Sequence, residues 1–136
     1  MKHCLIMTAY QDLPMINKFI EATPSDWGIY IHLDAKSKIQ VSDISSRAKV
    51  FKIKKIYWGA WEHLWVFVYL MKTAYAERRY DYYHLVSGQD FYATSPHNFD
   101  DVLGRDEKNY VALFPIPNNW WGWEGGLKIF KYRTLS

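Results

Sequence analysis

The stretch His3–Ala9, HCLIMTA, is a short apolar run bounded by polar residues. This pattern is typical of a strand that is buried on both faces in a parallel sheet. Asp12, followed by Pro14 and an apolar stripe, predicts an amphipathic helix that ends at Thr23–Ser25. The alternation over Trp27–Asp34 predicts a second strand with a carboxylate at its end. The first 34 residues therefore predict a β-α-β unit.

The same patterns predict the elements that follow this unit. They are a polar loop with a short helix over Ala35–Arg47, a strand over Lys49–Ile53, a long helix over Trp61–Arg79, a strand over Tyr80–Val86, a helix from Ser95 through Val102, a strand over Asn109–Phe114 and a last strand over Leu127–Tyr132. The long helix is apolar at so many positions that we expect it to be buried on most sides.

Strands that alternate with helices indicate an α/β fold with a doubly wound, mostly parallel sheet. Such sheets bind ligands at the carboxyl ends of their strands. The residues at these ends are Thr8-Ala9-Tyr10, Asp34-Ala35-Lys36 and Ser87-Gly88-Gln89-Asp90. We therefore expect the functional site to draw on these three segments.

The composition is that of a globular protein. The chain has 136 residues, and 17 Lys and Arg against 14 Asp and Glu give a net charge of +3, which is too weak to indicate a nucleic-acid partner. We expect one domain over 1–136, with an α/β core over 1–114 and an aromatic-rich tail over 115–136. Aromatic residues reach 18%, which indicates that some rings face a ligand or a partner.

Several classes of protein are disfavoured by missing signals. The single cysteine, Cys4, indicates a reducing compartment, and the most apolar segment, Leu64–Met71, is too short to cross a membrane. Without an export signal, we expect a cytoplasmic protein. The chain also lacks a G-x-G-x-x-G or P-loop phosphate motif, a G-x-S-x-G nucleophile motif and a cluster of His or Cys at zinc spacing.

Three segments together resemble a known family. They are IHLDAKS at Ile31–Ser37, YWG at Tyr57–Gly59 and YYHLVSGQDF at Tyr82–Phe91. In this order and spacing the chain resembles the core-2/I-branching β-1,6-N-acetylglucosaminyltransferase family (glycosyltransferase family 14), which includes protein xylosyltransferases, and it is most similar to the bacterial members. The resemblance runs from Lys2 to about Leu103 and covers the N-terminal part of the family domain.

This resemblance implies a GT-A-like, Rossmann-type fold, an inverting glycosyltransferase and a UDP-sugar donor, with UDP-N-acetylglucosamine favoured and a glycan hydroxyl as acceptor. It also implies that no divalent metal or other cofactor takes part. The family lacks the Asp-x-Asp metal site of this fold, and here Lys36 stands where a second metal-binding carboxylate would be. Lys and Arg side chains are then expected to neutralise the diphosphate.

The resemblance also suggests donor-binding residues. Ala9 and Tyr10 would border the uracil pocket, Asp34 would accept hydrogen bonds from uridine, Trp58 would line the donor-sugar side, Gly88 would let the backbone approach the nucleotide, and Asp90 would anchor its loop or touch the sugar. Each polar or aromatic candidate has a structural alternative. Asp34 could cap the following turn, Trp58 could be a core ring, and Asp90 could hold only its own loop.

The chain departs from the family in two ways. After the SGQDF segment the family continues with Pro, an aliphatic residue, Lys and Ser or Thr, whereas this chain has Tyr92–Ser95. Family members are also longer, and their catalytic Glu and phosphate-binding residues lie in the later half. Glu124, the carboxylate of the aromatic tail, is a weak candidate for the catalytic base because its position does not match the family's base.

We therefore expect a donor-binding half. Such a half would expose apolar surface that a second copy of the chain can cover, as a homodimer or by exchange of elements. The rival interpretation is a non-enzymatic nucleotide- or carbohydrate-binding module, or a truncated remnant.

Overall fold

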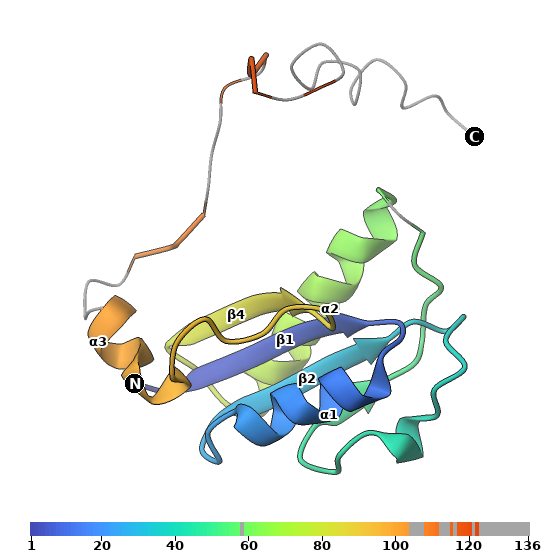
Figure 1. Ribbon diagram of the computed structural model, residues 1–136, viewed down its shortest axis with the longest axis horizontal. Coiled ribbons are helices and arrows are strands. Elements are labelled where there is room, and N and C mark those ends of the chain that lie inside the picture. Colours follow the sequence, from blue (N-terminus) through green and yellow to red (C-terminus); the bar gives the residue numbers. More distant parts are fainter. Residues whose placement is uncertain (58, 104–107, 112–114, 116, 121, 123–136) are drawn as a thin grey trace. The chain divides into compact units, whose positions relative to one another are not determined.

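A four-stranded, all-parallel sheet in the order β3-β2-β1-β4 forms the centre of the protein (Figure 1). In the computed structural model the described residues are 1–57, 59–103, 108–111, 115, 117–120 and 122. The chain divides into two compact units, Met1–Gly104 and Arg105–Ser136. The helices and strands given below lie in the first unit, so the α/β class predicted from the sequence is confirmed there.

The four strands fall where the sequence predicts them. They are β1 (His3–Ala9), β2 (Gly28–Leu33), β3 (Lys49–Phe51) and β4 (Tyr82–Ser87). β1 pairs with both β2 and β4, and all seven of its residues are buried. A strand with a neighbour on each edge and a helix on each face has no exposed position, which explains why its sequence is almost entirely apolar.

The helices are also close to the predicted ranges. They are α1 (Leu13–Ala22), α2 (Trp61–Glu77) and α3 (Phe99–Leu103), with short 3-10 helices η1 (Val41–Asp43) and η2 (Pro96–Asn98). Asp12 caps α1, since its Oδ1 accepts a hydrogen bond from the Met15 N–H at 3.2 Å. The helix predicted from Ser95 to Val102 is present as η2 followed by α3.

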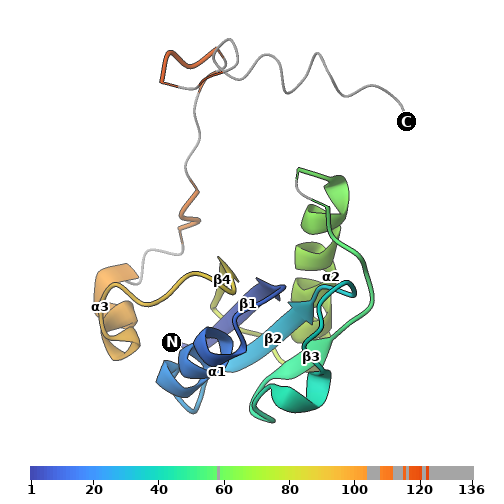
Figure 2. The same ribbon diagram turned by 45° about the vertical axis from the view of Figure 1, so that its right-hand side comes forward.

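The side chains of β1 alternate between two apolar layers. Leu5 and Met7 pack with α1 on one face, and Cys4 and Ile6 pack with α2 on the other. Figures 1 and 2 show α1 and α2 on opposite faces of the sheet. Cys4 is completely buried, and this burial raises the pKa of its thiol to about 12.

The prediction that the long helix is buried on most sides is wrong. Within the described residues, α2 buries Val66, Leu70 and Ala74 against the sheet. Four outward-facing apolar residues of α2 stay exposed: Trp61, Leu64, Val68 and Tyr75. The reason is geometric, because apolar residues at helical spacing look the same in a sequence whether their face meets the sheet or solvent.

The fifth predicted strand, Asn109–Phe114, is wrong over residues 109–111, which are exposed and form no strand. An apolar run forms a strand only where a neighbouring strand completes its hydrogen-bond ladder. Residues 112–114, and the last predicted strand at Leu127–Tyr132, lie outside the described residues.

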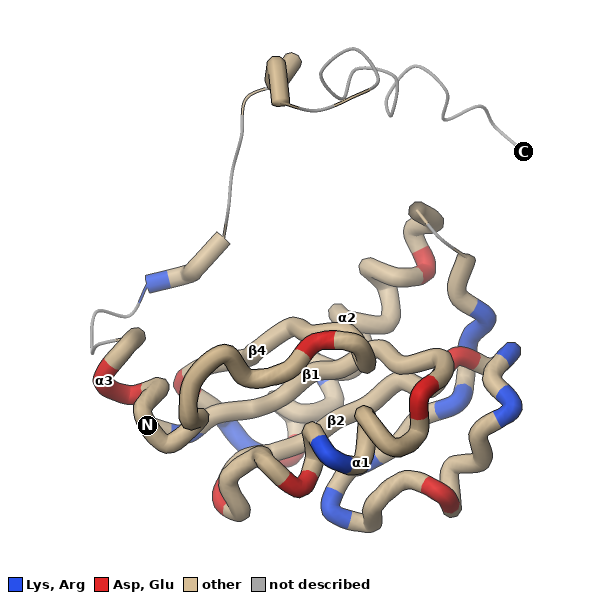
Figure 3. The backbone as a smooth tube through the Cα atoms, viewed as in Figure 1, with Lys and Arg blue, Asp and Glu red and all other residues tan. Residues whose placement is uncertain are grey.

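The charged residues of the described chain are interspersed, as Figure 3 shows for Lys and Arg against Asp and Glu. The helices in the described part of the chain are all too short or too polar to span a lipid bilayer.

Candidate functional site

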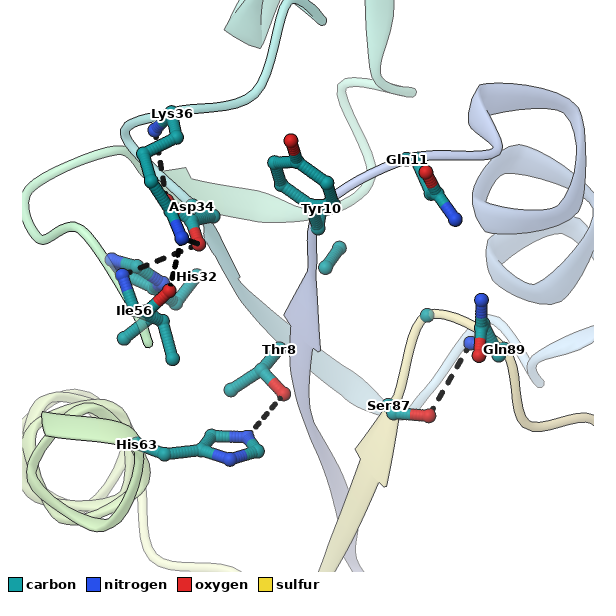
Figure 4. Close-up of a pocket in the computed structure, with 12 residues that line it drawn as sticks. Thr8, Tyr10, Gln11, His32, Asp34, Lys36, Ile56, His63, Ser87 and Gln89 are labelled. Carbon is teal, nitrogen blue, oxygen red and sulfur yellow. Dashed lines mark hydrogen bonds and ion pairs between the residues drawn. The ribbon is translucent and has the colours of Figure 1, made fainter. Parts of the chain in front are cut away.

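The carboxyl ends of β2, β1 and β4 lie side by side. Thr8 of β1 is in register with His32 of β2 on one side and with Ser87 of β4 on the other. A cleft of about 390 Å³ opens at these strand ends. Figure 4 shows Tyr10 and Gln11 beyond the end of β1, with side chains from the other strands around them.

Asp34 follows β2 and holds two loops together. Its Oδ1 accepts a hydrogen bond from the Lys36 N–H at 2.8 Å, and its Oδ2 accepts one from the Ile56 N–H at 3.2 Å. The bond to Lys36 caps the turn after β2, as the structural alternative for this residue proposed. Asp34 is 5% exposed, yet it lines the cleft, and each carboxylate oxygen has a lone pair left for a ligand.

The Lys36 ammonium is fixed at the mouth of the cleft. It donates a hydrogen bond to the Ile56 carbonyl at 2.5 Å and lies 3.6 Å from the Asp34 carboxylate. It also lies over the Tyr57 ring at 4.4 Å and the Tyr10 ring at 5.7 Å. These contacts hold a positive charge beside an exposed aromatic ring.

Gly88 follows β4 and lies close to the end of β1. Its N–H donates to the Thr8 carbonyl at 2.8 Å, and a Cβ at this position would lie 3.2 Å from the Ala9 Cβ. That distance is tighter than an ordinary contact, so glycine allows the two strand ends to meet. Asp90 accepts a hydrogen bond from the Ser87 N–H at 2.6 Å and so holds its own loop, as its structural alternative proposed.

Two histidines from different elements also line the cleft. His32 of β2 is completely buried, and its Nε2 accepts a hydrogen bond from the Lys54 N–H at 3.2 Å. Burial lowers the pKa of His32, so its ring is neutral and its proton lies on Nδ1. His63 comes from the first turn of α2, and its Nε2 lies 2.9 Å from the Thr8 Oγ1 (Figure 4).

Four of the predicted donor-binding residues meet at this one cleft: Ala9, Tyr10, Asp34 and Gly88. Asp90 is on the same loop as Gly88 but does not line it. Trp58 and Glu124 lie outside the described residues. In the described part of the chain, no three His, Cys, Asp or Glu side chains gather in a way that could hold a metal ion.

No family model and no curated protein matches the chain. The site is therefore defined by its own geometry.

Sequence reasoning missed His63, Ile56 and Gln11, which all line the cleft. A signal for His63 was present, because it opens a helix that follows a strand. In a parallel α/β sheet, the first turn of such a helix lies at the same edge as the strand ends. A histidine at that place therefore belongs near the site, even when no second ligand is adjacent in the sequence.

Proposed function

We propose that the protein binds a UDP-sugar at this cleft and acts as the donor-binding part of an inverting, metal-independent glycosyltransferase with a GT-A-like core. The observation that carries the proposal is the convergence of Ala9, Tyr10, Asp34 and Gly88 from three neighbouring strand ends on one cleft. The donor favoured is UDP-N-acetylglucosamine, and the acceptor is a hydroxyl of a glycan.

The uracil would lie against the exposed Tyr10 ring. Aromatic rings offer a flat surface on which a base stacks, and sequence-independent stacking of this kind is worth about 1–3 kcal/mol per base. The Asp34 carboxylate, with a free lone pair on each oxygen, would accept a hydrogen bond from the uracil N3–H or a ribose hydroxyl. Its two backbone partners fix its position before the ligand arrives.

Lys36 supports the metal-independent part of the proposal. Its ammonium lies at the mouth of the cleft, where it can approach a phosphate of the ligand. A fixed cation beside the diphosphate stabilises the negative charge that develops on the leaving group. The base that deprotonates the acceptor hydroxyl is not assigned among the described residues.

The test is a titration with UDP followed by tryptophan fluorescence, once with magnesium and once with EDTA. We expect saturable binding with the same dissociation constant in both conditions. The Asp34→Ala variant should lose binding, whereas Asp26→Ala, which removes an exposed carboxylate before β2, should bind as the wild type does.

Asp34→Asn is a second variant, since it keeps one oxygen for the Lys36 N–H and so preserves the turn. Circular dichroism should show that it is folded, and its UDP affinity should still fall. Binding that requires magnesium, or that Asp34→Asn leaves unchanged, would contradict the proposal. A response to oligosaccharides without any response to UDP would favour a carbohydrate-binding module instead.

A further inference from the structure

A nucleoside diphosphate brings two or more negative charges into the cleft, and four lining side chains can carry charge: Asp34, Lys36, His32 and His63. Asp34 and Lys36 lie 3.6 Å apart and offset each other. The pair therefore leaves the cleft close to neutral, so a diphosphate that Lys36 approaches still needs a further partner.

His32 is not that partner. It is completely buried, and this burial lowers its pKa by more than the neighbouring Asp34 carboxylate raises it. Its Nε2 is used by the Lys54 N–H, which ties the segment after β3 to β2. This imidazole holds the segment after β3 against β2 beside the cleft.

His63 differs from His32 in burial and in its contacts. Its side chain is half-buried and points from α2 toward Thr8 at the end of β1 (Figure 4). The Thr8 hydroxyl engages its Nε2 and the ring stacks on Phe67 with centroids 5.1 Å apart, so the ring is held in one orientation. Its Nδ1 has no hydrogen bond to any described residue and can donate to a ligand.

The position of His63 also favours an anion. It lies in the first turn of a 17-residue helix, in which the cap residue, Ala60, makes no side-chain hydrogen bond and Glu62 is the acidic residue. The field at a helix N-terminus attracts negative charge. The Thr8 hydroxyl, the Ser87 side chain and Gly88 also line the cleft, and a hydroxyl or a backbone N–H can donate a hydrogen bond to a phosphate oxygen.

We propose that His63 binds the diphosphate together with Lys36, with the base held by Asp34 and Tyr10. This inference rests on the proposed function, because it takes a uridine diphosphate as the ligand. It assigns the nucleoside to Asp34 and Tyr10, at the ends of β2 and β1, and the phosphates to His63 of α2 and to Lys36.

The experiment compares UDP, uridine and inorganic pyrophosphate by isothermal titration calorimetry on the full chain. His63→Ala should weaken UDP and pyrophosphate binding by about tenfold or more, which is the loss expected for a hydrogen bond to a charged group. Uridine binding should change by less than about twofold, since the nucleoside does not reach His63. His63→Gln, which keeps a hydrogen-bond donor, should bind UDP and pyrophosphate more weakly than the wild type and more tightly than His63→Ala.

His97→Ala removes an exposed histidine outside the cleft and should bind all three probes as the wild type does. Equal UDP affinities for the wild type and His63→Ala would overturn the inference and leave the proposed function standing. A parallel loss of uridine affinity in His63→Ala and His63→Gln would also overturn it, because it would show a structural role. Absence of UDP and uridine binding to the wild type would overturn both proposals.

Discussion

His84 of β4 is a half-buried imidazole that does not line the cleft. Its Nε2 lies 2.8 Å from the His3 Nδ1, and the other nitrogen of His3 lies 2.8 Å from the Asp100 carboxylate. Its ring stacks on Trp27 with centroids 4.9 Å apart. Burial, assisted by His3, lowers the pKa of His84 to about 4.

This shift predicts a loss of stability in mild acid. The unfolded chain takes up a proton on His84 near pH 6.5 and the folded chain only near pH 4, so the free energy of unfolding falls as the pH drops through this window. One group contributes a slope of at most about 1.4 kcal/mol per pH unit. Melting temperatures from circular dichroism between pH 7.5 and 4.5 would show the slope.

The variant His84→Gln keeps an amide that can donate to or accept from His3 without a titrating ring, so the slope should become shallower. It should not vanish, because burial also lowers the pKa of His32. His97→Gln, at an exposed position, is the matched control. An unchanged slope in His84→Gln would exclude His84 as its source.

The residues of the site differ in how well the sequence predicted them. Asp34 and Gly88 could be predicted because they directly follow strands, and strand ends meet at one edge of a parallel sheet. His63 could not be predicted from its type alone, since an isolated histidine is more often structural. The sequence also could not show that Asp90 bonds to its own loop and does not line the cleft.

At the scale of elements, α2 has two apolar faces with different surroundings. Leu70 is completely buried against the sheet, whereas Leu64, on the outward face, is 67% exposed. Leu70→Ala should lower the free energy of unfolding by about 2–5 kcal/mol, because it leaves a cavity. Leu64→Ala should change it by less than about 0.5 kcal/mol.

Urea denaturation of both variants measures this contrast. The two substitutions remove the same atoms from the same helix, so helix propensity cancels and burial alone separates them. A large loss in Leu64→Ala would show that another surface covers the outward face of α2 in solution, and the oligomeric state would then identify a second copy as its source.

The elements themselves were predicted well because each has local signals. Asp12 and Pro14 mark the start of α1, and alternation marks β2. What packs on an element is not a local property, which is why the exposed face of α2 was not foreseen. The predicted strand over Asn109–Phe114 has the composition of a strand, but residues 109–111 do not form one.

At the scale of the whole molecule, the strand order places β1 at the centre of the sheet. Composition and periodicity indicated a parallel sheet but do not by themselves order its strands, since several orders satisfy the same pattern. The order β3-β2-β1-β4 brings the ends of β2 and β4 to either side of the end of β1. The cleft is therefore a product of topology.

Cys4 lies in this central strand and is the single cysteine of the chain. Because its thiol is buried and its pKa is raised to about 12, an alkylating reagent at neutral pH should reach it only when β1 separates from its neighbours. We expect iodoacetamide to label the folded protein at least a hundredfold more slowly than the urea-unfolded chain, measured by mass spectrometry. Comparable rates would show that β1 is loosely held.

The alkylation rate of Cys4 therefore reports on the local stability of the sheet. Each alkylated molecule has passed through local unfolding of β1. The labelling rate therefore measures this unfolding, and no dye or engineered tag is needed. A nucleotide that binds across the strand ends should lower the labelling rate, and a tighter-binding nucleotide should lower it more.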